Sequence, residues 1–262
     1  MTDLSDLAGF ASGGLVGFVL GLIGGGGSIL AVPLLVYAVG VPSTHVAIGT
    51  SAVAVAVSAA VNLAGHARAG NVKWPCALVF AGAGIVGAAL GSQLGKAVDG
   101  ARLLLLFGLL MSGVAVAMLL RRDDGGDPDV RLTPGSAGHL LPRLVGFGTA
   151  VGMLAGFFGI GGGFLVVPGL LASTRMPLIT AVGSSLVAVT AFGATTAASY
   201  AVSGLVDWRL VALFVAGGAI GGLGGAALAR RLAARKALLS RLFAFVVAAT
   251  GLYVVIRGLG NL

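Results

Sequence analysis

A glycine-rich segment that interrupts apolar sequence occurs twice in this chain. Residues 21–33 read Gly-Leu-Ile-Gly-Gly-Gly-Gly-Ser-Ile-Leu-Ala-Val-Pro, and residues 156–168 read Gly-Phe-Phe-Gly-Ile-Gly-Gly-Gly-Phe-Leu-Val-Val-Pro, at an offset of 156 − 21 = 135. Consecutive glycines end a helix, and the N–H groups they leave unpaired are tolerated at membrane depth only where protein or a watery cavity satisfies them. A duplicated helix breaker in hydrophobic sequence therefore indicates a membrane transporter whose site lies where two repeats meet.

The composition places the chain in lipid. Of 262 residues, 58% are hydrophobic and 9% are charged, whereas soluble domains are about one quarter charged. We predict an all-α polytopic membrane protein, because most of its apolar runs approach the ~20 residues that cross a bilayer. These runs lie at about 46–64, 75–95, 103–120, 178–203, 208–229 and 242–256, and two more, at about 7–40 and 144–172, contain the glycine segments.

The repeat extends beyond the glycines. Residues 49–55 match residues 183–189, and Trp74 matches Trp208, at an offset of 134. The polar stretch that begins at Arg121 contains prolines and glycines and separates the two copies. We predict a first membrane repeat over 1–120, a cytoplasmic linker over 121–143 and a second membrane repeat over 144–262.

Loop charge distinguishes parallel from inverted repeats. If each glycine segment belongs to one crossing, each half crosses the membrane an even number of times, the repeats are parallel, and the Lys and Arg residues divide 8 against 8 between the two sides of the membrane. If each segment forms a hairpin or two crossings, the count is odd and the repeats are inverted. The inverted arrangement leaves 4 of the 16 basic residues on one side, Lys96, Arg102, Arg209 and Arg257, and 16 − 4 = 12 on the other. Because cytoplasmic loops are rich in Lys and Arg, we predict two inverted repeats, each with a glycine-broken re-entrant helical hairpin plus three transmembrane helices.

The consecutive glycines are the first candidates for a substrate site. A second half-helix is expected to begin near Ser28 and near Gly163, where free N–H groups carry a partial positive charge of about half a unit. Pro33 and Pro168 fit the first turn of such helices. In the alternative interpretation the glycines only form a tight turn. The candidates in these segments are Gly24, Gly25, Gly26, Gly27, Ser28, Gly159, Gly161, Gly162 and Gly163.

The charges narrow the ligand to an anion held by neutral groups. All eight acids are Asp, and each lies in a tail, a loop or a span end; no Lys or Arg lies in mid-span either. Cation carriers usually retain an intramembrane carboxylate. The neutral candidates are Thr50, Ser51, Asn62, Ser184, Ser185 and Thr196. Alternatively, each hydroxyl only bonds a carbonyl of the preceding turn.

The histidines, the net charge and the remaining polar residues give little support for a metal site, a nucleic-acid site or an enzyme. His45 and His66, at span ends, leave a proton-relay role open. No metal, cofactor or nucleic acid is expected, because no ligand cluster is evident and the net charge of +8 fits cytoplasmic loops. An enzyme is disfavoured for want of a nucleophile and base.

Glycines spaced by four predict helix packing seams. Gly13 and Gly17 recur as Gly148 and Gly152, and further pairs follow the same repeat. Such spacing puts the glycines on one helix face, where another backbone can approach closely. The further seam glycines are Gly21, Gly156, Gly87, Gly91, Gly221 and Gly225.

These motifs resemble the TauE/SafE family of sulfite exporter-like transporters from prokaryotic plasma membranes. The resemblance rests on the paired glycine segments, the prolines that follow them and the Gly-[Thr/Ser]-Ser stretches at 49–51 and 183–185, and it covers about 7–257. It implies export of sulfite and related sulfur-containing or organic oxyanions across the plasma membrane. Ile160 interrupts the second glycine run, so the two segments are not expected to contact substrate equally. An anion-selective channel and a non-transporting sensor or assembly subunit are the alternatives, and the oligomeric state stays open.

Overall fold

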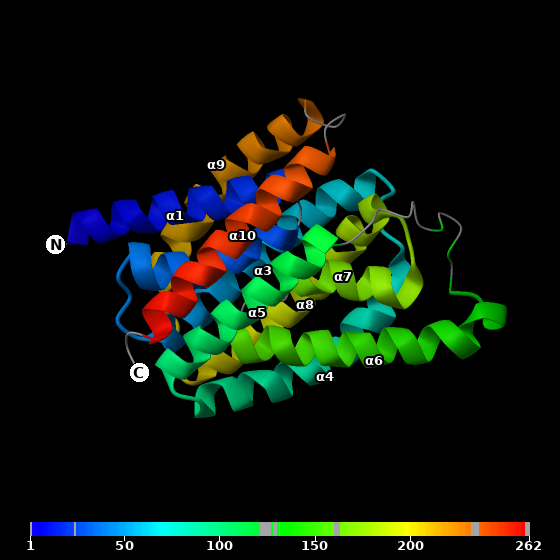
Figure 1. Cartoon of the computed structure of the whole chain (residues 1–262), viewed down its shortest axis with the longest axis horizontal. Coiled ribbons are helices and arrows are strands. Elements are labelled where there is room, and N and C mark those ends of the chain that lie inside the picture. The colour runs from blue at the N-terminus through cyan, green and yellow to red at the C-terminus, as the bar shows by residue number, and fades with distance from the viewer. Residues whose placement is uncertain are drawn as a thin grey trace.

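The protein is all-α in the computed structural model, which describes residues 2–23, 25–120, 127, 130, 132–159, 163–231 and 236–259. No strand occurs among these residues. Most of the helices lie roughly side by side in one bundle (Figure 1). In chain order the elements are α1 (Thr2–Ile23), η1 (Gly25–Leu30), α2 (Ala31–Pro33), η2 (Leu34–Ala38), α3 (Thr44–Arg68), α4 (Trp74–Ala97), α5 (Gly100–Leu120), α6 (Pro134–Phe158), α7 (Gly163–Thr174), α8 (Leu178–Val202), α9 (Trp208–Arg231) and α10 (Lys236–Leu259).

Seven helices of the described part are long and apolar enough to cross a membrane: α1, α3, α4, α5, α6, α8 and α9. A shorter apolar stretch, Val247–Gly258, lies in α10. Large apolar side chains point outward from the bundle; Val202 is 91% exposed and Leu223 is 76% exposed. In water such a surface would be unfavourable, whereas lipid tails accommodate it. The predicted all-α polytopic fold is thereby confirmed.

Helix α6 begins inside the segment predicted as linker. Thr133 caps it: its Oγ1 accepts from the Ser136 N–H at 3.4 Å, while the Ser136 hydroxyl accepts from the Thr133 N–H at 2.9 Å. Pro134 occupies the first helical position, where its missing N–H costs little. Residues 134–143 are therefore helical because a capping box and a first-turn proline start the helix ten residues before the long apolar run.

The glycines spaced by four form packing seams between α1 and α9 and between α4 and α6, which lie side by side (Figure 1). A Cβ at Gly13 would overlap the Phe214 carbonyl, and a Cβ at Gly17 would overlap the Gly218 carbonyl. Equivalent overlaps occur across the other seam at Gly148, Gly152, Gly156, Gly87 and Gly91, and Gly221 and Gly225 complete the first. Only a residue without a side chain allows these backbones to touch, so the seam prediction is confirmed for these positions.

The two seams join the halves of the chain to each other. Under the repeat offsets, α1 corresponds to α6 and α4 to α9, so each seam pairs a helix of one half with a helix of the other. Helices α3 and α8, which correspond to each other, pack together between the seams: α3 also contacts α9, and α8 also contacts α4. Gly49 lies near Tyr200 and Ala56 near Gly193, so α3 and α8 run antiparallel. The core is therefore shared between the halves.

Candidate substrate site

Both predicted glycine breaks interrupt helices in the structure. Helix α1 ends at Ile23 and the chain resumes at Gly25 as a 3₁₀-helix. Helix α6 ends at Phe158, and Gly159 adopts a left-handed conformation with φ of 66° before α7 begins at Gly163. Glycine takes that conformation without a Cβ penalty. The candidates Gly24, Gly161 and Gly162 lie outside the described residues.

The two arms of each predicted hairpin are unequal. Helices α1 and α6 have 22 and 25 residues, which is long enough to cross a ~30 Å hydrocarbon core. Gly95, near the end of α4, packs against Phe157, so the second break lies level with the end of that span rather than halfway along it. The following arm, α7, has 12 residues and reaches only about 18 Å. Only the second arms are therefore short.

The prolines lie deeper in the short arms than predicted. Pro168 is the sixth residue of α7, in its second turn, because the helix already begins at Gly163. Pro33 follows the 3₁₀ turns of Gly25–Leu30, and a π-helical turn comes directly after it, at Leu34–Ala38. A proline inside a helix removes one backbone hydrogen bond, which fits the change in helix type beside Pro33. The expectation of a first-turn proline was therefore wrong for Pro168, whereas Pro33 is the third residue of the short α2.

The short arms of the two halves meet in the interior. Element η1, whose backbone includes Gly25 and Gly26, packs against α7. Gly27 and Ser28 are buried, as are Gly163 and the three residues after it. A Cβ at Gly27 would lie 2.5 Å from the Leu20 nitrogen, so the first arm folds tightly back on α1. The short arms that follow the two glycine segments are thus brought together.

Helix α3 closes over the second break. A Cβ at Gly159 would overlap the Ile48 side chain, and the Ser51 Oγ lies 3.5 Å from the Gly159 carbonyl oxygen. The Ser51 hydroxyl also donates to the Ile48 carbonyl at 2.9 Å, and Ser185 donates to Val182 at 2.7 Å. The gap beside this break is closed: the space between α2, α3, α5 and α6, lined by Val32, Thr44, Ile48, Leu103, Leu104, Phe107 and Phe158, is too narrow for a water molecule.

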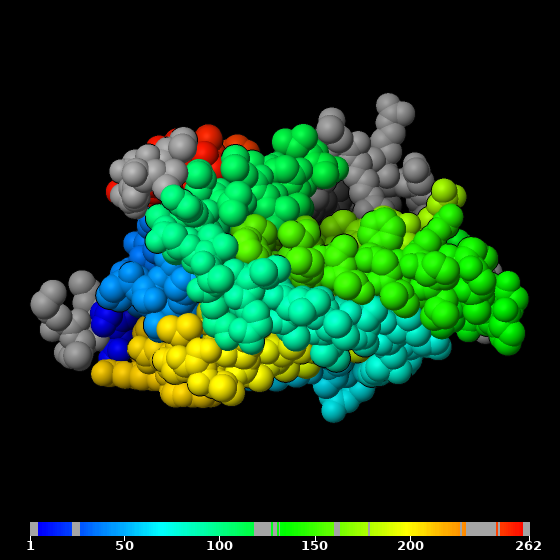
Figure 2. Space-filling model, turned by 90° about the horizontal axis from the view of Figure 1, so that it is seen from below, coloured from blue at the N-terminus to red at the C-terminus, as the bar shows by residue number. Residues whose placement is uncertain are grey.

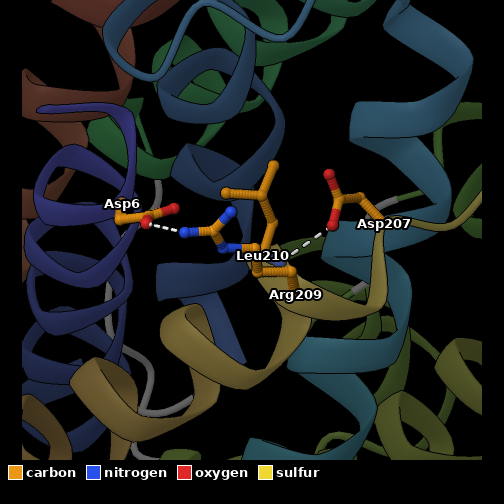
Figure 3. A network of polar contacts seen from close by, with 4 residues as sticks. All are labelled: Asp6, Asp207, Arg209 and Leu210. Atoms are coloured by element: carbon orange, nitrogen blue, oxygen red, sulfur yellow. Dashed lines mark hydrogen bonds and ion pairs between the residues drawn. The ribbon is translucent and has the colours of Figure 1, made fainter. Parts of the chain in front are cut away.

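Thr50 and Ser184 bind backbone N–H groups of the opposite half. The Thr50 Oγ1 accepts from the Asp207 N–H at 3.0 Å, and the Ser184 Oγ accepts from the Lys73 N–H at 2.9 Å. The start of α9 is held further by the Asp207 carboxylate, which accepts from the Leu210 N–H at 3.0 Å, and by an ion pair between Arg209 and Asp6 (Figure 3). Both hydroxyls therefore fix where a helix begins, and their predicted contact with substrate stays a prediction.

The remaining candidates lie at other levels of the bundle. Asn62 is half-buried and donates to the Ser58 carbonyl at 2.9 Å. Thr196 is fully buried and its Oγ1 has no hydrogen-bond partner among the described residues. It is 196 − 185 = 11 residues from Ser185 on α8, about 16 Å along the axis. An unpartnered hydroxyl inside a bundle is available to a ligand or to water.

The two histidines cannot pass a proton directly to each other. His45 and His66 lie 66 − 45 = 21 residues apart on α3, a separation of about 30 Å. Each has a buried Nδ1 without a hydrogen-bond partner among the described residues. A role in proton movement would therefore be separate for each histidine.

The buried polar side chains of the described residues are neutral. Apart from the Tyr200 phenol and the Cys76 thiol, they are all hydroxyls of Ser and Thr: Ser12, Ser28, Thr50, Ser51, Ser92, Ser173, Thr174, Ser184, Ser185 and Thr196. A ligand in this part of the interior would meet hydroxyl and backbone groups. Hydroxyls both donate and accept, whereas backbone N–H groups only donate.

Sequence reasoning overlooked one polar feature, a groove between α4 and α8. It has a volume of about 550 Å³ and includes Ser92, Gln93 and Lys96 on α4 and Thr195, Ser199 and Ser203 on or beside α8. Two sequence signals point to this groove. Hydroxyl residues spaced by four at 195, 199 and 203 share one helix face, and Lys96 follows Ser92 and Gln93 by four and three residues, which puts all three on one face.

Comparisons with known proteins agree on one family. The family model described as Sulfite exporter TauE/SafE matches residues 9–254. A "Probable membrane transporter protein" of Xylella fastidiosa (strain Temecula1) is 50% identical over 262 residues, covering 100% of this chain and 99% of the relative. "Probable membrane transporter protein YunE" of Bacillus subtilis (strain 168) is 27% identical, covering 83% of this chain and 86% of the relative. No solved structure gives a significant match. The chain therefore belongs to the TauE/SafE family and is a membrane transporter rather than an enzyme.

Proposed function

We propose that this transporter exports small oxyanions, of which sulfite is the model substrate, across the plasma membrane of a prokaryote. The substrate would bind at the interface of the two halves, where the short arms that follow their glycine segments meet. The contact between η1 and α7 carries the proposal, because it brings the short arms that follow the two helix breaks into one buried place. Broken helices at repeat interfaces are the usual location of transporter sites.

The chemistry of the interior supports an anionic substrate. Helix α7 begins at the buried Gly163, where the first N–H groups of a helix lack partners within it and attract negative charge. The hydroxyls of Ser28 and Ser51 lie buried near the breaks. A small oxyanion presents only acceptors and is complemented by the N–H groups at the start of α7. The family description, which names sulfite, gives the oxyanion to test first.

We further propose that the two halves are inverted repeats. Helices α3 and α8 correspond under the repeat offset and run antiparallel, which supports opposite orientations. The division of Lys and Arg into 12 and 4 supports the same arrangement. In an inverted pair, α1 would end at one membrane surface and α6 at the other, so that the short arms approach the shared site from opposite sides. Alternating access then needs only one half to rock against the other.

Flux in proteoliposomes tests this function. Purified protein in liposomes loaded with radiolabelled sulfite should show saturable efflux. Excess unlabelled sulfite should inhibit this efflux, whereas added potassium or sodium should not inhibit it. Very fast flux that does not saturate would indicate a channel, and no flux of any small oxyanion would favour a sensor or assembly subunit.

A matched pair of glycine variants ties the flux to the break. Gly159→Ala puts a Cβ onto the Ile48 side chain at a left-handed backbone position and should remove most of the flux. Gly146→Ala lies in α6, the helix that ends just before Gly159; it has open space around it and should leave flux unchanged. Equal flux from both variants, at matched amounts of folded protein, would contradict a site at the break.

A further inference from the structure

The groove between α4 and α8 lies on the flank of the bundle. Figure 2 views this side, where the blue-green end of α4 lies against yellow residues of α8. Ser92 lies beside Ser199, and Lys96 beside Ser203, so the two helices run parallel and both end near the groove. Six of the nine lining residues are polar, and none of the nine is acidic.

The ammonium group of Lys96 is held in the groove without a carboxylate partner in the described residues. Its Nζ donates to the Ser199 carbonyl at 3.3 Å and to the Ser203 Oγ at 3.0 Å, and it lies 5.8 Å from the centre of the Tyr200 ring. An ammonium has three N–H donors, and these contacts use two. A positive charge with a spare donor is therefore fixed in place beside the open space.

Two further donors are available in the groove. The exposed Gln93 is three residues before Lys96, which puts both side chains on one face of α4. The Ser199 Oγ lies 3.0 Å from the Ser92 Oγ, and Ser92 also donates to the Ala89 carbonyl at 2.9 Å. When Ser92 donates to the Ser199 Oγ, the Ser199 hydroxyl hydrogen is free for a ligand. Thr195 and Ser203 instead donate to carbonyls of α8.

The other half of the chain lacks most of these polar side chains. Helices α9 and α3 correspond to α4 and α8 and also pack together. At the offset of 134, the polar positions Ser92, Gln93, Thr195, Ser199 and Ser203 correspond to Ala226, Ala227, Val61, Gly65 and Ala69. Only the basic residue is retained, as Arg230. The polar lining is therefore particular to the α4–α8 pair and is not a general feature of the repeat.

We propose that the α4–α8 groove binds a small tetrahedral or pyramidal oxyanion, through the charge of Lys96 and the donors of Gln93 and Ser199. The same chemistry recognises free sulfate, sulfite or phosphate and the phosphate of a lipid headgroup. Gly95 packs against Phe157, close to the second glycine break, so the groove lies at the level where that break occurs. A free oxyanion bound here is held at the level of the second break, at one end of the short arm that would line the transport site. This last step rests on the proposed function, whereas binding itself does not.

Calorimetric titration of the full-length protein in phosphatidylcholine nanodiscs tests the site. Sulfate, sulfite and phosphate should each bind to the wild type in the absence of any gradient. Lys96→Gln should weaken binding about tenfold or more, the loss of one charge-assisted hydrogen bond, and Lys96→Arg should retain most of it. Arg102→Gln is the matched control, because it removes an exposed positive charge at the next helix without touching the groove, and it should change affinity less than about twofold.

Thermal unfolding of each variant separates lost binding from lost folding. Because Lys96 also bonds the last turn of α8, Lys96→Gln could lower stability. Gln93→Leu and Ser199→Ala remove the other two donors without removing the charge, and they should also weaken binding. Wild-type protein that binds none of the three ions, or folded Lys96→Gln and Gln93→Leu proteins that bind them as well as the wild type, would overturn the proposal.

Lipid content distinguishes the two sources of the oxyanion. If the occupant is a headgroup, native mass spectrometry should find phosphatidylglycerol retained by the wild type and lost in Lys96→Gln, and phosphatidylglycerol nanodiscs should suppress sulfate binding. If it is a free ion, sulfate binding should persist in both lipids. If binding depends on Lys96 but no sulfite flux is found, the proposed transport is contradicted and the groove site stands. If sulfite flux is found but binding does not depend on Lys96, the groove site is contradicted and the proposed transport stands.

Discussion

The Thr50 hydroxyl lies 3.0 Å from the backbone nitrogen of Asp207 and accepts its hydrogen bond across 157 residues of sequence. The repeat-equivalent bond joins Ser184 to the nitrogen of Lys73 at 2.9 Å. Each hydroxyl lies in a central helix of one half and holds the residue before a seam helix of the other half. The paired hydroxyls therefore link the two halves where their helices begin.

Thr50→Val should destabilise the fold by about 1–3 kcal/mol, because it leaves the Asp207 N–H without its acceptor. Valine has nearly the same shape, so little packing is lost. Thr50→Ser keeps the acceptor and should unfold close to the wild-type temperature. Thermal unfolding in one detergent measures both variants. Flux per folded molecule should be near normal; a stable Thr50→Val protein with no flux would instead make Thr50 a substrate contact.

Gly91→Ala should reduce the yield of folded protein, because its Cβ would overlap the Met153 carbonyl across the seam between α4 and α6. Gly82→Ala is the control in the same helix: its Cβ would meet nothing within 4 Å. Alanine favours a helix over glycine by up to about 1 kcal/mol at either position, so only the contact differs. Size-exclusion chromatography of fluorescent fusions would compare the yields, and equal monodisperse peaks would refute the seam.

Single cysteines at Arg68 and Val202 should react with impermeant thiol reagents from opposite sides of the membrane. Both positions are exposed, and they are the last residues of α3 and α8. They are equivalent in the two repeats, because 202 − 68 = 134, the repeat offset. A Cys76→Ala background removes the chain's one native cysteine, which is buried. Inverted repeats place equivalent positions on opposite faces. Labelling of both cysteines from the same face would show parallel repeats.

Local signals in the sequence predicted much of the fold. The glycine runs located the interruptions after Ile23 and Phe158, and glycines spaced by four identified both seams, because these signals need no knowledge of distant partners. The start of α6 at Pro134 was also encoded locally. It was overlooked because the prolines and glycines around it resemble a linker, although Thr133 and Ser136 form a capping box.

The candidate site was less predictable, because its contacts join residues far apart. The repeat pairing selected Thr50 and Ser184 as a pair, but no local pattern showed that their partners are backbone N–H groups of Asp207 and Lys73. The groove likewise depends on Lys96 reaching Ser203, 107 residues away on another helix. Helix periodicity describes one helix at a time, whereas a site between helices depends on which faces pack together.

The final prediction concerns the driving force of the proposed oxyanion export, which should be the membrane potential alone. The buried polar side chains described here are neutral, so the substrate would carry the moving charge. An inside-negative potential contributes about 2.3 kcal/mol per charge per 100 mV, so a dianion gains roughly 4–5 kcal/mol on leaving, equivalent to a gradient of more than about a thousandfold. In sulfite-loaded liposomes, a potassium-diffusion potential negative inside should speed efflux, and the reversed potential should slow it. Efflux that ignores the potential but follows a pH gradient, and that is lost in His45→Ala or His66→Ala, would instead establish proton coupling through one of these histidines.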